Sequence, residues 1–230
     1  MLSIMIKFFR LLIFVGSLLI AAGSSCAADE NWVFIDENQG VTIHSRKVAG
    51  HAESEFKGTR IINQPVEVIG AVLTDIPSYT RWFFNCIQAR KIPDQTSTDL
   101  NFRIYIVIET PWPLWNRDVI YDARTMVDIP LGKIMVWGKA LQDASVPIRE
   151  KHVKVTDSAI EWDLERLDDN RTMVSFTKQI NIGGSIGSYL SDAGCRKTIV
   201  ESLVNLGRIA SEPKYAALGN ELKGRYDKSN

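Results

Sequence analysis

The feature that most constrains the fold is a series of segments in which apolar and polar residues alternate. Every second residue from Leu100 to Ile108 is apolar, which is the pattern of a strand with one buried face. Similar patterns predict strands at residues 41–46, 56–62, 119–127, 132–140, 153–156, 160–165 and 173–180. Turn residues, for example those at 168–170, separate the segments, and this favours antiparallel pairing.

Three helices are predicted from apolar residues at helical spacing. Two are short and lie at residues 66–73, directly after Pro65, and at residues 78–84. The third covers residues 185–210 and, at about 1.5 Å per residue, extends for roughly 39 Å, enough to cross a whole sheet. Residues 211–230 are largely polar, and we expect them to form a frayed C-terminal tail.

This order of elements predicts an α+β protein with the helix-grip arrangement. In that arrangement a curved antiparallel sheet is closed by a long C-terminal helix around an apolar cavity, and enclosed apolar cavities are where small ligands are usually held. The roughly 200 residues that follow the N-terminal segment are expected to form one domain.

Residues 1–28 have the features of a secretory signal peptide. Lys7 and Arg10 precede an uncharged, mostly apolar run, and small residues follow it. The run is shorter than the roughly 20 apolar residues that a membrane-spanning helix needs. We therefore expect a cleaved signal peptide and a periplasmic or secreted protein. An uncleaved N-terminal anchor and a lipoprotein anchored at Cys26 are the alternatives.

The charge and the metal-binding residues exclude several functional classes. Without Lys7 and Arg10 the chain has 25 basic and 27 acidic residues, which provides no basis for nucleic-acid binding. The three histidines and the remaining cysteines are not at metal-ligand spacing, and no phosphate-binding glycine loop is present. We expect no metal and no cofactor. Whether Cys86 and Cys195 form a disulfide is open at this stage.

One catalytic motif is present, because residues 183–187 match the G-x-S-x-G pattern of a hydrolase nucleophile elbow around Ser185. That mechanism needs a histidine later in the chain than the serine, and all three histidines precede Ser185. We therefore expect the glycines to form a turn and Ser185 to cap the following helix.

Residues 110–118 combine two tryptophans, two prolines and a polar Asn-Arg-Asp triplet. Each proline restricts its own φ and biases the preceding residue away from helix, so an extended loop is expected. Trp112 and Trp115 are then expected to pack at one end of the cavity. The polar triplet is expected to tie the loop to the sheet through hydrogen bonds: Asn116, Arg117 and Asp118.

The same segment resembles the P-W-P-x-x-x-R-D signature of START (StAR-related lipid transfer) domains, in particular of bacterial ones. Residues 161–162, 172–176, 183–186 and 203–206 resemble the final strands, the helix entry and the end of the closing helix of that family, so that residues 29–210 are expected to form a START-like domain. Sterol-binding members carry a buried acid–base pair, and the positions that match it are Ile104 and Ala123. Both are apolar, so the resemblance does not imply sterol recognition of that kind.

The resemblance implies non-catalytic binding and transfer of a lipid or other hydrophobic ligand. We expect a monomer that makes transient contact with a membrane. The candidates for lining the cavity are Trp82, Phe102, Ile104, Ile106, Trp112, Trp115, Tyr121, Ala123, Leu190 and Leu203. The alternative is an aromatase/cyclase-like enzyme that acts on an apolar substrate on the same fold, for which Tyr121, Thr125 and Asn85 are the inward-facing polar candidates.

Overall fold

The computed structural model describes residues 31–93, 97–143, 146–147, 149–183 and 187–227. Within these residues the chain forms ten strands, four α-helices and one 3-10 helix. The strands are β1 (Val33–Asn38), β2 (Val41–Lys47), β3 (Ser54–Ile62), β4 (Cys86–Ile92), β5 (Asn101–Ile108), β6 (Asn116–Asp128), β7 (Lys133–Ala140), β8 (His152–Val155), β9 (Asp157–Asp168) and β10 (Arg171–Asn181). The helices are α1 (Val66–Thr74), η1 (Ile76–Ser78), α2 (Tyr79–Trp82), α3 (Ser188–Ala210) and α4 (Pro213–Tyr226).

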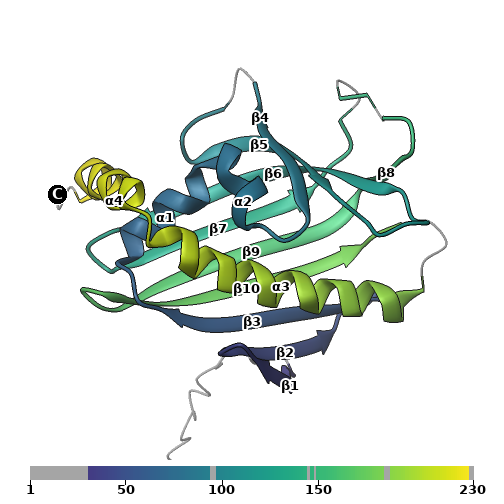
Figure 1. Ribbon diagram of the computed structural model, residues 1–230, viewed down its shortest axis with the longest axis horizontal. Coiled ribbons are helices and arrows are strands. Elements are labelled where there is room, and N and C mark those ends of the chain that lie inside the picture. The colour runs from purple at the N-terminus through teal and green to yellow at the C-terminus, as the bar shows by residue number, and fades with distance from the viewer. Residues whose placement is uncertain (1–30, 94–96, 144–145, 148, 184–186, 228–230) are drawn as a thin grey trace, which may run out of the picture. The chain divides into compact units, whose positions relative to one another are not determined.

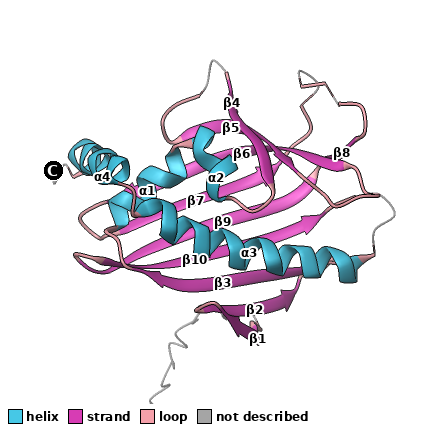
Figure 2. Ribbon diagram, in the orientation of Figure 1, coloured by secondary structure: helices cyan, strands magenta, loops and turns pink. Residues whose placement is uncertain are grey.

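The strands form one sheet in the order β1-β2-β3-β10-β9-β7-β6-β5-β4, and every neighbouring pair along this path is antiparallel. The short strand β8 lies off the path and pairs with β6 in parallel. Helix α3 lies across one face of the sheet with α1 and α2 beside it (Figures 1 and 2). The predicted helix-grip fold is confirmed, with β8 as the exception to antiparallel pairing.

The second half of α3 packs directly onto the sheet. Ile199, Leu203 and Leu206 are fully buried, and β3 approaches them closely at Gly58. A Cβ atom at Gly58 would lie 2.3 Å from Cγ2 of Ile199. No larger residue fits here without moving the helix, so the absence of a side chain at this position sets how closely helix and sheet approach.

An aromatic cluster fills the centre of the concave face. The rings of Trp162 and Phe176, on neighbouring strands, stack with centroids 3.8 Å apart and planes 4° apart. Trp82 from α2 meets Trp162 edge-on at 5.6 Å, and Phe83 meets Phe176 at 6.0 Å. Each such pair contributes about 0.5–1.5 kcal/mol beyond its buried area. Aromatic side chains therefore fill this part of the interior.

Two strands were not predicted, and both lack a cleanly buried face. All six residues of β1 are exposed, because it is an edge strand that only β2 pairs. Gln39 and Gly40 connect the two strands with φ angles of 53° and 72°, the left-handed values that tight hairpins need. In β4, the other edge strand, the middle of the sequence is polar and only its ends are buried.

The C-terminal region differs from the prediction of a frayed tail. Residues 213–226 form helix α4, which packs against α1, so the closing helix α3 is not the last helix. Tyr215 is fully buried, and its hydroxyl donates to Oδ2 of Asp75 at 3.0 Å. Close packing is possible because Gly219 lies against the backbone of Val68. A few apolar contacts, too sparse to give a clear pattern in sequence, order this segment.

Helix α3 begins at Ser188 with Gly187 as its N-cap, three residues later than predicted. Ser185, the expected cap, lies outside the described residues. Cys86 and Cys195 are both buried and free, which answers the question left open by the sequence. Of the helices in the described part of the chain, none is both long enough and apolar enough to span a membrane.

Candidate functional site

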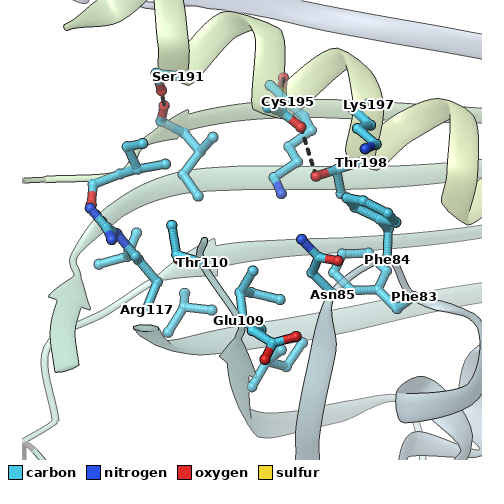
Figure 3. Close-up of a pocket in the computed structure, with 18 of the residues that line it drawn as sticks. Phe83, Phe84, Asn85, Glu109, Thr110, Arg117, Ser191, Cys195, Lys197 and Thr198 are labelled. Atoms are coloured by element: carbon cyan, nitrogen blue, oxygen red, sulfur yellow. Dashed lines mark hydrogen bonds between the residues drawn. The ribbon is translucent and has the colours of Figure 1, made fainter. Parts of the chain in front are cut away.

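A cavity of about 320 Å³ lies between the first half of α3 and the end of the sheet where β5 and β6 meet the 109–115 loop. Figure 3 shows Ser191, Cys195 and Thr198 on its α3 side, facing Thr110 and Arg117. We call this space the α3 cavity. Its volume is at the lower end of the range for small-molecule pockets, roughly 300–1,000 Å³.

Most of the wall of the α3 cavity is apolar. The apolar lining residues come from the α2–β4 turn, β5, β6, the 109–115 loop, the end of β8, the end of β10, and α3. They are Phe83, Phe84, Ile106, Ile108, Pro111, Leu114, Val119, Val155, Ile180, Ile182 and Leu190. Segments that are distant in the sequence thus meet around one space.

Of the ten candidates predicted for the cavity wall, three lie in it: Ile106, Tyr121 and Leu190. Five others are buried in the core but outside the lining: Trp82, Phe102, Ile104, Ala123 and Leu203. Their side chains face the concave side, as predicted, but they lie in the part of the interior that side chains fill.

The two loop tryptophans do not line the cavity, which corrects the expectation that they pack at its end. Trp112 is 91% exposed and Trp115 is 56% exposed. Leu114, between them, and Pro111 provide the loop's contribution to the wall. The loop turns its tryptophans outward because the interior beside it is already bounded by Leu114 and by the side chains of β5 and β6.

The polar triplet after the loop opens β6, and each of its side chains makes a specific bond. Asn116 accepts a hydrogen bond from the backbone N–H of Thr110 at 3.1 Å, which joins the two ends of the loop. Arg117 donates to the backbone oxygens of Trp115 and Ile182. Because Ile182 follows β10, Arg117 links the loop to the far side of the cavity. Burial lowers the pKa of Arg117.

Asp118 lies on the opposite face of the sheet from the cavity. Its carboxylate accepts a hydrogen bond from the Tyr105 hydroxyl at 2.7 Å and contacts Nδ1 of His152 at 2.5 Å. The carboxylate is 5% exposed. These contacts tie β8 to β6 and β5 beside a small apolar cluster that includes Ile120, so Asp118 acts as an anchor of the sheet.

Three hydroxyl groups of the cavity wall, those of Ser191, Thr198 and Tyr121, are engaged in structural hydrogen bonds. Ser191 donates to the backbone oxygen of Ile180, and Thr198 donates to that of Gly194. The Tyr121 hydroxyl bonds to Ser158 at 2.9 Å, and burial raises its pKa. Cys195 is buried, and burial raises the pKa of its thiol to about 11, so it is not a thiolate near neutral pH.

The described lining contains none of the three histidines, so no hydroxyl or thiol there faces an imidazole base. The polar residues named for a cyclase-like site are dispersed. Tyr121 and Asn85 line the α3 cavity, but Thr125 lies outside it, and its hydroxyl is buried without a hydrogen-bond partner. Among the described residues, no group of three or more histidine, cysteine, aspartate or glutamate side chains is placed to hold a metal ion.

Among the many lining residues that the sequence analysis did not name, Lys178 is a buried charged one. It lies on β10, it is 5% exposed, and burial lowers its pKa. The signal was present in the sequence: Val174, Phe176 and Ile180 alternate on the buried face of the strand, and Lys178 occupies the remaining position of that face. A lysine at a position that faces the core departs from the apolar residues expected on the buried face of a strand.

The fold and the cavity together define a class: a helix-grip protein with a largely apolar pocket under its long helix. Comparison with solved structures places this chain in the START fold. A STAR-related lipid transfer protein from Xanthomonas axonopodis is 23% identical and superposes with a TM-score of 0.70, covering 80% of this chain and all of that fragment. Human STARD10 is 18% identical with a TM-score of 0.69, covering 85% of this chain and 76% of its own.

In sequence, an uncharacterised protein of Pseudomonas aeruginosa is 23% identical over 184 residues, which cover 80% of this chain and 88% of that protein. No protein-family model matches the chain. The START fold predicted from the 110–118 signature is therefore confirmed by the structural comparisons.

Proposed function

We propose that this protein binds a lipid or another hydrophobic molecule in the α3 cavity, without chemically changing it, and carries it between membranes. The observation that carries the proposal is the apolar cavity enclosed by α3, the sheet and the 109–115 loop. Burying an acyl chain there is favourable by about 0.8 kcal/mol per CH₂ group, so binding needs no reactive group. The hydroxyls of Ser191, Thr198 and Tyr121 are occupied by protein partners, which also supports binding over catalysis.

The first experiment identifies the ligand. The protein is purified from its native compartment without added lipid, and its organic extract is examined by mass spectrometry. We expect a hydrophobic molecule at near-stoichiometric amount. A protein that carries nothing and also fails to bind a fluorescent lipid analogue would refute the proposal.

The second experiment blocks the cavity. Thr198 is buried in the wall, so Thr198→Phe places a large ring in the space that a ligand would occupy. Thr80→Phe is the matched control, because Thr80 lies exposed on α2 outside the cavity. We expect the first variant to weaken binding of the fluorescent lipid at least about 10-fold and the second to leave it unchanged. Equal binding by both variants would place the ligand elsewhere.

We further propose that the rim of the cavity contacts a lipid bilayer during exchange. Trp112, Trp115 and Leu190 are 91%, 56% and 61% exposed, and Leu190 also lines the cavity. Tryptophan is favoured at the interface between water and lipid. In a vesicle flotation assay, the double variant Trp112→Ala and Trp115→Ala should bind less than the wild type. Trp137→Ala, which removes a 39% exposed tryptophan from β7, should bind like the wild type.

We propose that the protein acts after export, in the periplasm or outside the cell. This rests on the signal-peptide features of residues 1–28, which lie outside the described residues. The intact mass of the protein purified from its native source should correspond to cleavage after Ala27 or Ala28. A full-length mass would support an uncleaved anchor, and a mass increased by lipid on Cys26 would support a lipoprotein.

A further inference from the structure

Lys178 occupies an apolar environment on β10. The residues two before and two after it on the same strand, Phe176 and Ile180, belong to the hydrophobic core. Its neighbours in the sheet register are Phe56 on β3 and Ile160 on β9, which are also buried. Strand alternation thus directs a four-carbon stem and an ammonium group to the side of the sheet that α3 covers.

The described residues provide this ammonium with no anionic partner and no hydrogen-bond acceptor. Its Nζ lies 5.7 Å from the centre of the Phe83 ring. The titratable group that acts electrostatically on it is Cys195 on α3, whose sulfur donates to the backbone oxygen of Lys178. The pKa of that thiol, raised to about 11 by burial, keeps it neutral. A buried cation without a counter-charge is costly, so a charge-bearing partner is expected when the site is filled.

The other charged residues of the cavity wall do not provide a counter-charge for the Lys178 ammonium. Arg117 on β6 is a second cation, and its guanidinium already donates to two backbone oxygens. Lys197 on α3 is exposed and lies over the Phe84 ring. Glu109 is the acidic residue of the described lining, and it is exposed at the mouth of the cavity. The interior of the α3 cavity is therefore positive.

We propose that the ligand of the α3 cavity carries a carboxylate, which pairs with the ammonium of Lys178 while the rest of the molecule lies against the apolar wall. This inference rests on the proposed function. One ammonium matches the single charge of a carboxylate. A phosphate monoester carries about −1.5 to −2 near pH 7 and is best matched by the two-pronged donor set of a free arginine. The volume of about 320 Å³ favours a single-chain acid over a two-chain lipid.

The test compares hexadecanoic acid with its methyl ester and with hexadecyl phosphate, each in competition with a fluorescent lipid analogue. Wild-type protein should bind the acid about 10- to 100-fold more tightly than the ester, the range expected for a hydrogen bond to a charged group. Lys178→Met keeps the length of the side chain and removes its charge, so it should bind acid and ester equally. Lys139→Met removes an exposed charge on β7, outside the cavity, and should keep the wild-type preference.

The possible outcomes separate the two proposals. Equal binding of acid and ester by wild-type protein, or a preference that survives in Lys178→Met, overturns the pairing and leaves hydrophobic binding intact. Tighter binding of the phosphate than of the acid overturns the assignment to a carboxylate. If none of the three compounds displaces the fluorescent lipid, this inference fails while hydrophobic binding stands. If the fluorescent lipid itself does not bind and the purified protein carries no ligand, the proposed function fails as well.

A stability measurement checks the premise independently of any ligand. Because Lys178→Met removes an unpaired buried charge, the ligand-free variant should unfold at a higher temperature than ligand-free wild type. Lys178→Gln, which keeps a polar end without the charge, provides the same comparison. If both variants unfold at a lower temperature than wild type, the ammonium has a stabilising partner and the premise is wrong.

Discussion

Replacing Gly58 by alanine tests whether close packing of α3 against the sheet at this position stabilises the fold. The added Cβ would lie 2.3 Å from Cγ2 of Ile199, 3.1 Å from Cδ1 of Leu203 and 3.1 Å from Cγ1 of Val41. Normal carbon–carbon contact begins at about 3.5 Å, so the first of these contacts requires a displacement of roughly 1.2 Å. Ile199 is β-branched and restricted to essentially one rotamer in a helix, so the helix itself has to move.

Two opposing effects set the change in the free energy of unfolding. Overpacking of this kind costs about 1–3 kcal/mol, and replacing glycine by alanine within a strand returns about 0.5–1 kcal/mol of backbone entropy. The difference of these ranges is roughly 0–2.5 kcal/mol, and we expect Gly58→Ala to lower the free energy of unfolding by about 1 kcal/mol, near its middle. The assay is equilibrium urea unfolding of the ligand-free protein, followed by tryptophan fluorescence and circular dichroism.

Gly194→Ala is the matched control, since Gly194 lies in α3 and a Cβ there would meet no atom within 4 Å. Its free energy of unfolding should rise by about 0.8–1 kcal/mol, the difference in helix propensity between alanine and glycine. If Gly58→Ala is as stable as wild type, close packing at this position does not hold α3, and the account of the helix–sheet contact is wrong.

Three further predictions concern other parts of the molecule. Deleting residues 213–230 removes the fully buried Tyr215, so the free energy of unfolding should fall by about 3 kcal/mol and the melting temperature by at least about 6 °C. An unchanged melting temperature would show that α4 contributes nothing to stability. Binding of a carboxylate ligand should weaken as pH rises through the lowered pKa of Lys178, because only the protonated amine pairs with it. Between that lowered pKa and the ordinary value near 10.5, ligand-free wild type should instead gain stability with rising pH relative to Lys178→Met, because the unfolded chain binds the extra proton; parallel pH profiles would contradict this. Asp118→Ala leaves the buried Tyr105 hydroxyl and the part-buried His152 without this partner, so it should lower the free energy of unfolding by about 1–3 kcal/mol, measured by urea unfolding.

The strands that could be predicted are those with one buried and one exposed face. In β9 and β10 the alternation of the sequence matches the alternation of burial, because α3 and the aromatic cluster cover only one side. In β5 the second face is also buried at Tyr105 and Val107, which belong to a separate small cluster. Strand β1 has no buried face, so its sequence contains no such signal. Helix α4 has a polar composition and is ordered by tertiary contacts such as that of Tyr215 with Asp75.

The candidate site could be predicted less well than the fold. Alternation correctly placed Ile104, Phe102 and Ala123 on the inner face, but it could not separate inner positions that touch the cavity from those that touch other side chains. The loop tryptophans were assigned inward on hydrophobicity, and the structure turns them outward. Lys178 was overlooked because a lysine within a strand is usually exposed.

The order of the strands between the two edge strands, the antiparallel sheet and the long covering helix were determined by the sequence alone, because alternation and helical spacing are local properties of the chain. The edge strands β1 and β4 and the helix α4 were not. The position and size of the α3 cavity were decided only by the tertiary structure. Trp82, Trp162 and Phe176, far apart in the sequence, fill one half of the concave face, and the first half of α3 leaves the other half open. The empty volume depends on how side chains from distant segments pack together, and those segments meet only once the chain has folded.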